Sequence, residues 1–90
     1  ITKVMSTPTT VTTVSKVIAA ANPNRKAFVI FNNSSNSCYV SCGDVSVAST
    51  CTWLIATFAS KDWVSPLCYT GPLSAIRNSG TGVITVWEFD

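Results

Sequence analysis

Few residues in this chain of 90 could do chemistry, and histidine is absent. The commonest general base is therefore missing, and no Ser-His or Cys-His nucleophile pair can form. The acids are sparse, at Asp44, Asp62, Glu88 and Asp90, and no pattern brings two of them to one cleft, as glycoside hydrolysis requires. The Ser-Gly-Thr-Gly turn at 79–82 lacks the lysine of a phosphate-binding loop. We expect no enzymatic activity, no catalytic residue and no cofactor.

The four cysteines are Cys38, Cys42, Cys51 and Cys68. Fully oxidised, they allow three pairings. Cys38 and Cys42 lie on one expected strand, where a rise of roughly 3.3 Å per residue separates them by about 13 Å. A disulfide needs Cα atoms within about 7 Å, so we predict no Cys38–Cys42 bond, while Cys42–Cys51 and Cys38–Cys68 bonds stay open. Zinc is disfavoured by the loose spacing and missing histidine. We expect small buried thiols and no metal.

Charge is scarce. Charged residues make up 11% of the chain, against about 25% in an ordinary soluble domain, and Ser, Thr and Asn take their place. We interpret the six basic residues as isolated and solvated, which disfavours a nucleic-acid partner; they are Lys3, Lys16, Arg25, Lys26, Lys61 and Arg77. No apolar run is long enough to span a bilayer, and the Thr-rich start is not expected to be a signal peptide. A weakly charged surface suits contacts with other proteins.

The elements that must position these residues are strands, because the hydrophobic period is two and β-branched residues are abundant. The fold expected is all-β, a small antiparallel β-sandwich or barrel of about seven or eight short strands. Segments 26–32 and 37–42 are predicted to form a β-hairpin, with the first covered on both faces. Strands are expected at 11–18, 26–32, 37–42, 51–58, 62–65, 73–77 and 83–89, and 45–49 is an ambiguous edge strand.

Alternation within the strands predicts the core. Phe28, Ile30 and Val40 should be buried. Trp53 and Trp87 are expected to fill the core as well, whereas Trp63, beside two charged residues near a turn, is the tryptophan expected at the surface. The alternative is an aromatic platform, with Tyr39 and Tyr69, for a sugar or single-stranded nucleic acid.

The first ten residues are expected to form an extended arm, residues 1–10, ahead of a single β domain, residues 11–90. The arm contains apolar Ile1, Val4 and Met5, and Pro8 disfavours helix there. We expect it to extend onto a neighbouring subunit, as an added strand. The candidate partner-contact residues are therefore Ile1, Val4 and Met5, together with Trp63 and Tyr69.

A family resemblance rests on the order of several motifs. Asn-Pro-Asn-Arg-Lys at 22–26 leads into an apolar strand ending Phe-Asn-Asn-Ser-Ser at 31–35, followed by Cys-Tyr-Val-Ser-Cys-Gly at 38–43. Tyr-Thr-Gly-Pro-Leu-Ser-Ala-Ile at 69–76 then precedes the 79–82 turn and a final Val-Ile-Thr-Val-Trp-Glu strand. Over residues 10–88 this order resembles the small all-β virion proteins of tailed bacteriophages, of the head-decoration (cement) or head- and tail-fibre type. The four cysteines and the segment 45–68 depart from that pattern.

The resemblance implies a structural virion protein, a capsid decoration or cement protein that binds and stabilises the major capsid lattice. Its implied partners are the major capsid protein or other virion proteins, and it would form homo-oligomers, with trimers expected. It would be located in the virion, assembled in the host cytoplasm, with no nucleic-acid or membrane contact. The alternative is a tail-fibre, receptor-binding or carbohydrate-binding module of a virion, which exposed Trp63, Tyr69 or Tyr39 in a groove would support.

Overall fold

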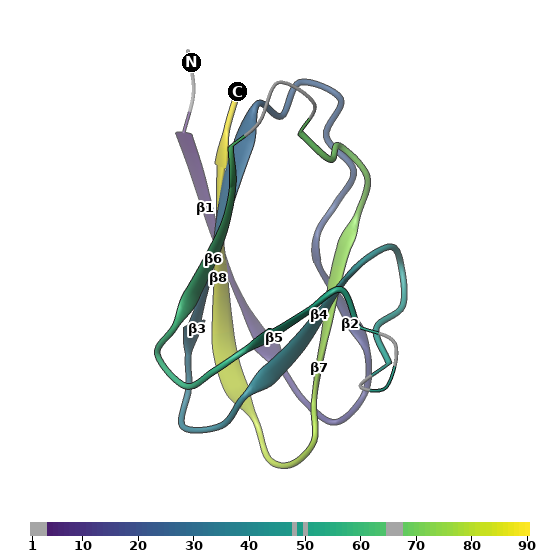
Figure 1. Ribbon diagram of the computed structural model, residues 1–90, viewed down its shortest axis with the longest axis vertical. Coiled ribbons are helices and arrows are strands. Elements are labelled where there is room, and N and C mark those ends of the chain that lie inside the picture. The colour runs from purple at the N-terminus through teal and green to yellow at the C-terminus, as the bar shows by residue number, and fades with distance from the viewer. Residues whose placement is uncertain (1–3, 48, 50, 65–67) are drawn as a thin grey trace.

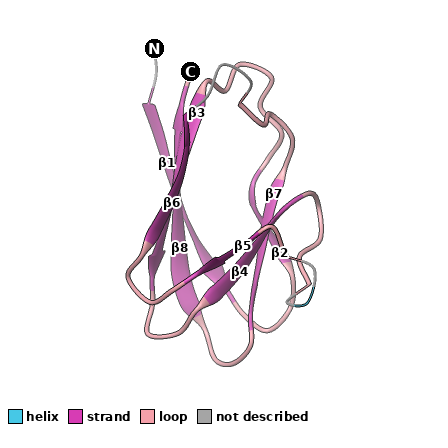
Figure 2. Cartoon of the chain, in the orientation of Figure 1, coloured by secondary structure: helices cyan, strands magenta, loops and turns pink. Residues whose placement is uncertain are grey.

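The computed structural model describes residues 4–47, 49, 51–64 and 68–90, and these residues build eight β-strands (Figures 1 and 2). Their order along the chain is β1 Val4–Val11, β2 Lys16–Ala19, β3 Ala27–Asn33, β4 Cys38–Cys42, β5 Trp53–Ile55, β6 Ser60–Val64, β7 Leu73–Arg77 and β8 Gly82–Phe89.

Two four-stranded sheets face each other, with strand orders β1-β8-β3-β6 and β2-β7-β4-β5. Every neighbouring pair is antiparallel. This order of eight strands in two sheets is that of a jelly roll. The sheets stand apart as two layers in Figure 1. The all-β prediction of seven or eight short strands is confirmed, and of its two forms the fold is the sandwich rather than the closed barrel.

The core lies between the sheets, where alternate residues of both layers meet. Phe28, Ile30 and Val40 are fully buried, as predicted. The pattern of β8 also holds, because Ile84 and Val86 face inward while Thr85 and Trp87 face outward. Full burial of such side chains contributes roughly 1.5–3 kcal/mol each, so a domain this small depends on every one of them.

The hairpin expected from 26–32 and 37–42 is wrong. β3 pairs with β6 and β8, whereas β4 pairs with β5 and β7 in the other sheet. The polar residues between β3 and β4 therefore cross from one layer to the other. The prediction that this strand is covered on both faces is also wrong for this chain, because Val29 and Phe31 are only half-buried. A short turn signal tells where a strand ends but not which sheet the next strand joins.

Two other expected strands differ in extent. The segment 11–18 is divided, because the chain leaves β1 at Val11 and enters β2, in the opposite sheet, at Lys16. The segment 51–58 forms a strand only over Trp53–Ile55. In the first case the inward face changes where the chain changes sheet, which explains why its apolar positions shift from one alternation to the other.

The N-terminal segment is not free in this chain. Residues Val4–Val11 form β1 and pair along their whole length with β8, from Val4 opposite Phe89 to Val11 opposite Gly82. Ile1 lies outside the described residues. The expectation that residues 4–10 extend away from their own domain therefore differs from the structure, in which they form an edge strand of it.

Candidate functional site

At one end of the sandwich, a buried arginine ties three segments together. Arg25 is 3% exposed, and its Nε and Nη2 atoms both contact Oε1 of Glu88, at 2.8 and 2.6 Å. Nη1 donates to the carbonyl oxygens of Tyr69 and Gly71, and Nη2 to that of Ala20. All five guanidinium N–H groups thus have an acceptor. The contact set fastens the β2–β3 and β6–β7 connections to β8.

The expectation that the basic residues are isolated and solvated is wrong for two of them. Arg25 and Arg77 are 3% and 2% exposed. The signal in the sequence was Glu88, which alternates with Ile84 and Val86 and so had to face inward. A buried carboxylate is stabilised by a cation that is buried beside it. The alternation in β8 could therefore have predicted that one basic residue is buried, but not that it is Arg25.

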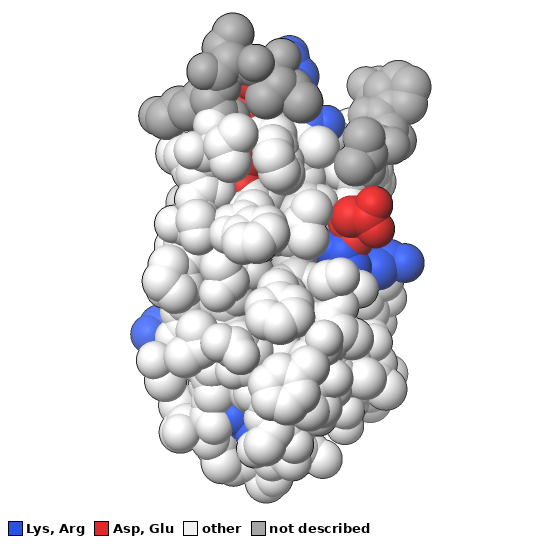
Figure 3. Space-filling view, turned by 90° about the vertical axis from the view of Figure 1, so that its left-hand side faces the viewer, with Lys and Arg blue, Asp and Glu red and all other residues white. Residues whose placement is uncertain are grey.

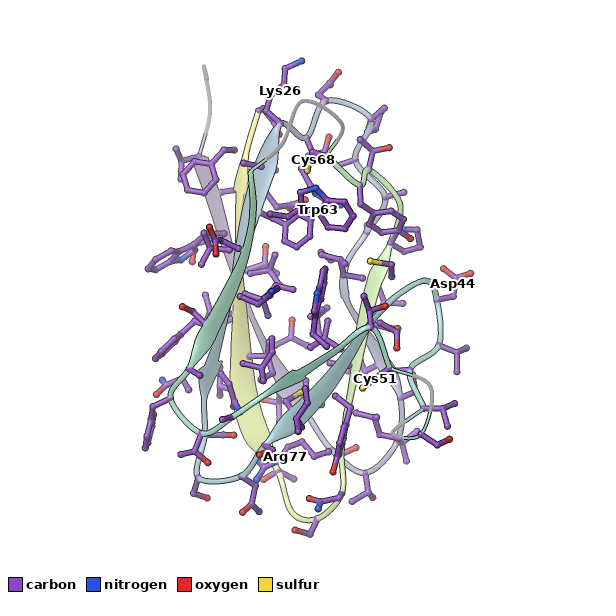
Figure 4. The ribbon with its side chains drawn as sticks, in the orientation of Figure 1. Lys26, Asp44, Cys51, Trp63, Cys68 and Arg77 are labelled. Atoms are coloured by element: carbon purple, nitrogen blue, oxygen red, sulfur yellow. The ribbon has the colours of Figure 1, made fainter. Side chains whose placement is uncertain are left out.

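An aromatic cluster packs beside this arginine. The ring of Phe28 lies 6.0 Å from Trp53 and 5.8 Å from Trp63, and Trp63 stacks on Tyr69 at 6.3 Å. The Arg25 guanidinium lies 5.6 Å from the Phe28 ring centroid, a cation–π distance. Tyr69 donates its hydroxyl to the Pro72 carbonyl. The cluster joins both sheets, and the labelled Trp63 points into the space between them in Figure 4.

The structure reverses two of the tryptophan predictions. Trp87 is 43% exposed, on the outer face of β8, whereas Trp63 is half-buried and packs against the core. Trp53 packs against the core as expected. The alternation of apolar residues in this segment already predicts that Trp87 lies on the face opposite to that of Ile84 and Val86. Residue type was the misleading signal, since large aromatics are buried on average but not always.

The cysteines are all free thiols, and they differ in position. Cys38 is fully buried, Cys42 and Cys68 are half-buried against the core, and Cys51 is half-buried outside it. Burial raises the pKa of the Cys38 thiol to about 11, and it also raises the pKa of Cys42 and of Cys68. These three thiols are therefore protonated at neutral pH and are poor nucleophiles.

Cys42 and Cys51 belong to the segments that carry β4 and β5, but the strand pairing does not reach them. β4 pairs with β5 only as far as Val40 opposite Trp53, and Cys51 lies two residues before β5. The Cys42 amide donates to the Thr52 hydroxyl at 3.1 Å. Cys38 and Cys42 share the continuous strand β4, as predicted. Figure 4 places Cys68 in the upper half of the molecule and Cys51 in the lower half.

The described residues among the predicted partner contacts lie in two places. Val4 is 61% exposed and Met5 half-buried, both on the edge strand β1. Trp63 and Tyr69 belong to the aromatic cluster, so a partner could reach only their outer portions. The structure thus brings Trp63 and Tyr69 together. Val4 and Met5 lie on β1, at the opposite edge of the sheet from β6, which carries Trp63.

The described part of the chain offers neither a metal site nor a membrane-spanning helix. Residues 4–47, 49, 51–64 and 68–90 contain no group of three or more cysteine or acidic residues placed to hold a metal ion. Over the same residues there is no helix of the length and apolarity needed to cross a membrane.

No family model and no curated protein matches the chain. Among solved structures, one described as "Bacillus endospore appendages form a novel family of disulfide-linked pili" shares the fold. It aligns with a TM-score of 0.52 and 11% sequence identity over 96% of this chain and 84% of its own. The sandwich of this chain is therefore similar to that of a subunit of disulfide-linked pili from Bacillus.

This likeness overturns the resemblance to phage virion proteins. The expected roles of capsid decoration or cement protein, and of a tail-fibre or receptor- or carbohydrate-binding module, are wrong, as are capsid partners, trimers in a capsid and a location in the virion. The motifs behind them were turn residues and strand ends, which many antiparallel sandwiches share because their loops obey the same turn chemistry. Compared as a whole fold, the chain is similar to a pilus subunit.

Proposed function

We propose that this chain is a non-enzymatic structural subunit that polymerises with copies of itself into an extracellular fibre, linked by disulfides between subunits. The observation that carries the proposal is the fold shared over 96% of the chain with a protein of disulfide-linked pili. The composition agrees with it, because low charge and abundant hydroxyl side chains suit a surface covered by other subunits.

A polymer held by disulfides needs at least two accessible cysteines in each subunit, because one cysteine can link only two copies. Cys38 is unsuited, being fully buried. Cys51 is half-buried and lies outside the core, and Cys68 is half-buried in the loop before β7. They occupy different halves of the molecule (Figure 4). A bond from Cys51 of one copy to Cys68 of the next is head-to-tail, and such contacts generate open chains when they do not close.

The chemistry of each link is an oxidation. Two thiols lose two protons and two electrons, and the acceptor is a small-molecule disulfide such as oxidised glutathione, which is reduced to two thiols. Because burial raises the pKa of Cys68, its thiolate fraction is small at neutral pH. Linking should therefore accelerate as the pH rises toward 9.

Other contacts between subunits are proposed at the edge strand. Val4 and Met5 of β1, with Ile1 preceding them, would lie against the neighbouring copy. An edge strand offers unpaired backbone groups for such contact. Trp63 and Tyr69 would contribute the outer portions of their rings.

The test is oxidation of the reduced full chain with oxidised glutathione, followed by non-reducing electrophoresis and negative-stain electron microscopy. The wild type should give a ladder of covalent multimers and fibres. Cys51→Ser and Cys68→Ser should each stop the ladder at dimers, whereas Cys38→Ala, at a buried position, should leave it intact. A wild-type chain that forms neither ladder nor fibre would refute the polymer. A full ladder from the Cys51→Ser/Cys68→Ser double variant would refute the assignment of the linking residues.

A further inference from the structure

The other sheet covers only the inner face of the β1-β8-β3-β6 sheet. On the outer face the described residues are exposed or half-buried, except for Ala27, which is 5% exposed. Directly opposite residues of antiparallel strands share a face, so the strand register defines its composition. Phe28, Ile30, Ile84 and Val86 occupy the inner face. The outward residues form four cross-strand rows: Val4, Phe89 and Ala27; Ser6, Trp87, Val29 and Asp62; Pro8, Thr85, Phe31 and Ser60; and Thr10, Val83 and Asn33.

Eight of these fourteen outward residues are apolar, and one, Asp62 on the edge strand β6, is charged. Trp87 is 43% exposed in the centre of the face. Its indole Nε1 already donates to the Ser6 hydroxyl at 2.8 Å. A partner would therefore contact the apolar surface of the indole ring rather than its N–H group. Figure 3 shows this side of the molecule, where charged side chains appear mainly at the margins, and ring side chains project outward from the same sheet in Figure 4.

A strained turn adds a further aromatic ring at the edge of this sheet. Phe58 is 63% exposed and has φ of 55°, in the turn closed by the Ala59 amide and the Ala56 carbonyl. Glycine or asparagine normally takes that position, and a bulky residue there costs free energy. Ser60, two residues later, stands opposite Phe31. Phe58 is both exposed and held in a backbone conformation that is unfavourable for its residue type. Because its ring does not contribute to the core, this combination indicates a role in contact with another molecule.

We infer that this face binds the same face of a second copy of the chain, sheet against sheet. The identity of the partner rests on the proposed function. The scarcity of charge favours a partner surface that is also weakly charged. A strongly charged protein, a nucleic acid or an anionic membrane would meet no basic residue in the outward rows. In a two-fold contact the only acid, Asp62, lies at an edge rather than at the centre, so self-pairing forces no buried like charges together.

The size of the face is adequate for such a contact. The Cα envelope measures 36 Å along the sandwich and 17 Å along its shortest axis, the two directions displayed in Figure 3. These lengths give a planar area of about 600 Å², close to the roughly 800 Å² that each partner of a stable pair buries. Two such sheets can pack with their strands about 30° apart, as sheets do inside a sandwich.

The experiment measures self-association of the reduced full chain by sedimentation velocity, in excess reductant so that no disulfide contributes. The wild type should form reversible dimers. Trp87→Glu places a like charge at the centre of the contact and should raise the dissociation constant by about tenfold or more. An equimolar mixture of Trp87→Glu and Trp87→Lys should recover association, because opposite charges then meet. Phe58→Gly should weaken association while leaving the melting temperature unchanged or higher, since it removes the strain.

Leu54→Glu is the matched control. Leu54 is 61% exposed, against 63% for Phe58, and it lies on the outer face of the other sheet. It should leave the dissociation constant unchanged. A wild type that remains monomeric at millimolar concentration, or equal effects of Trp87→Glu and Leu54→Glu, would overturn the inference. The oxidised ladder is scored separately: a ladder without reduced dimers refutes only this face, and reduced dimers without a ladder refute only the disulfide-linked polymer.

Discussion

Among substitutions of a single charged residue, replacement of Arg25 should cause the largest loss in the free energy of unfolding. Arg25→Met leaves the Glu88 carboxylate buried without its cation and the carbonyls of Ala20, Tyr69 and Gly71 without their guanidinium donors. Breaking a buried ion pair from one side typically costs about 3–5 kcal/mol. A domain of this length has a total free energy of unfolding of roughly 5–13 kcal/mol, so much of it should be lost.

The measurements are urea denaturation and thermal denaturation of the reduced protein, each monitored by circular dichroism and tryptophan fluorescence. At about 4–8 °C per kcal/mol for a domain of this size, the melting temperature should fall by more than about 12 °C. The Arg25→Met/Glu88→Leu double variant should recover part of the loss, because no buried charge remains, but not all, because the three carbonyls still lack their donors.

The neighbouring basic residue provides the control. Lys26 is exposed, and Lys26→Met should change the unfolding free energy by less than about 0.5 kcal/mol. The reasoning fails if Arg25→Met stays within about 1 kcal/mol of the wild type. It also fails if the double variant is less stable than Arg25→Met, since the carboxylate would then not be the source of the damage.

Two further predictions concern the core. Phe28→Ala should lower the unfolding free energy by about 3–5 kcal/mol, because Phe28 is fully buried among Trp53 and Trp63; Val29→Ala, facing outward on the same strand, is the control, and a loss below about 1 kcal/mol for Phe28→Ala would remove this ring from the core. Burial raises the pKa of Cys38 to about 11 from 9.0, so the folded state holds a proton there that the unfolded state releases. Stability should therefore decrease as the pH rises from 9 to 11, and less steeply in Cys38→Ala; parallel decreases in the two proteins would contradict the shift.

Local sequence patterns are sufficient to predict the class of this fold and much of its core. Period-two alternation is a local property, so it placed Phe28, Ile30 and Val40 inside, and Ile84 and Val86 opposite Trp87. The turn residues located most strand ends within a few positions. The missing histidine also removed the commonest catalytic arrangements, which no arrangement in space could restore.

Which strands are neighbours and which charges are buried depends on how the whole chain folds. β3 and β4 follow each other in the chain but lie in different sheets, while β1 pairs with β8 from the other end of the sequence. Glu88 and Arg25 are 63 residues apart and meet only because of that topology. Long-range pairing depends on how all the strands share one core, and that information is distributed over the chain rather than carried by any local motif. For the same reason, the motifs that suggested a phage virion protein could not distinguish it from a fold like that of a pilus subunit.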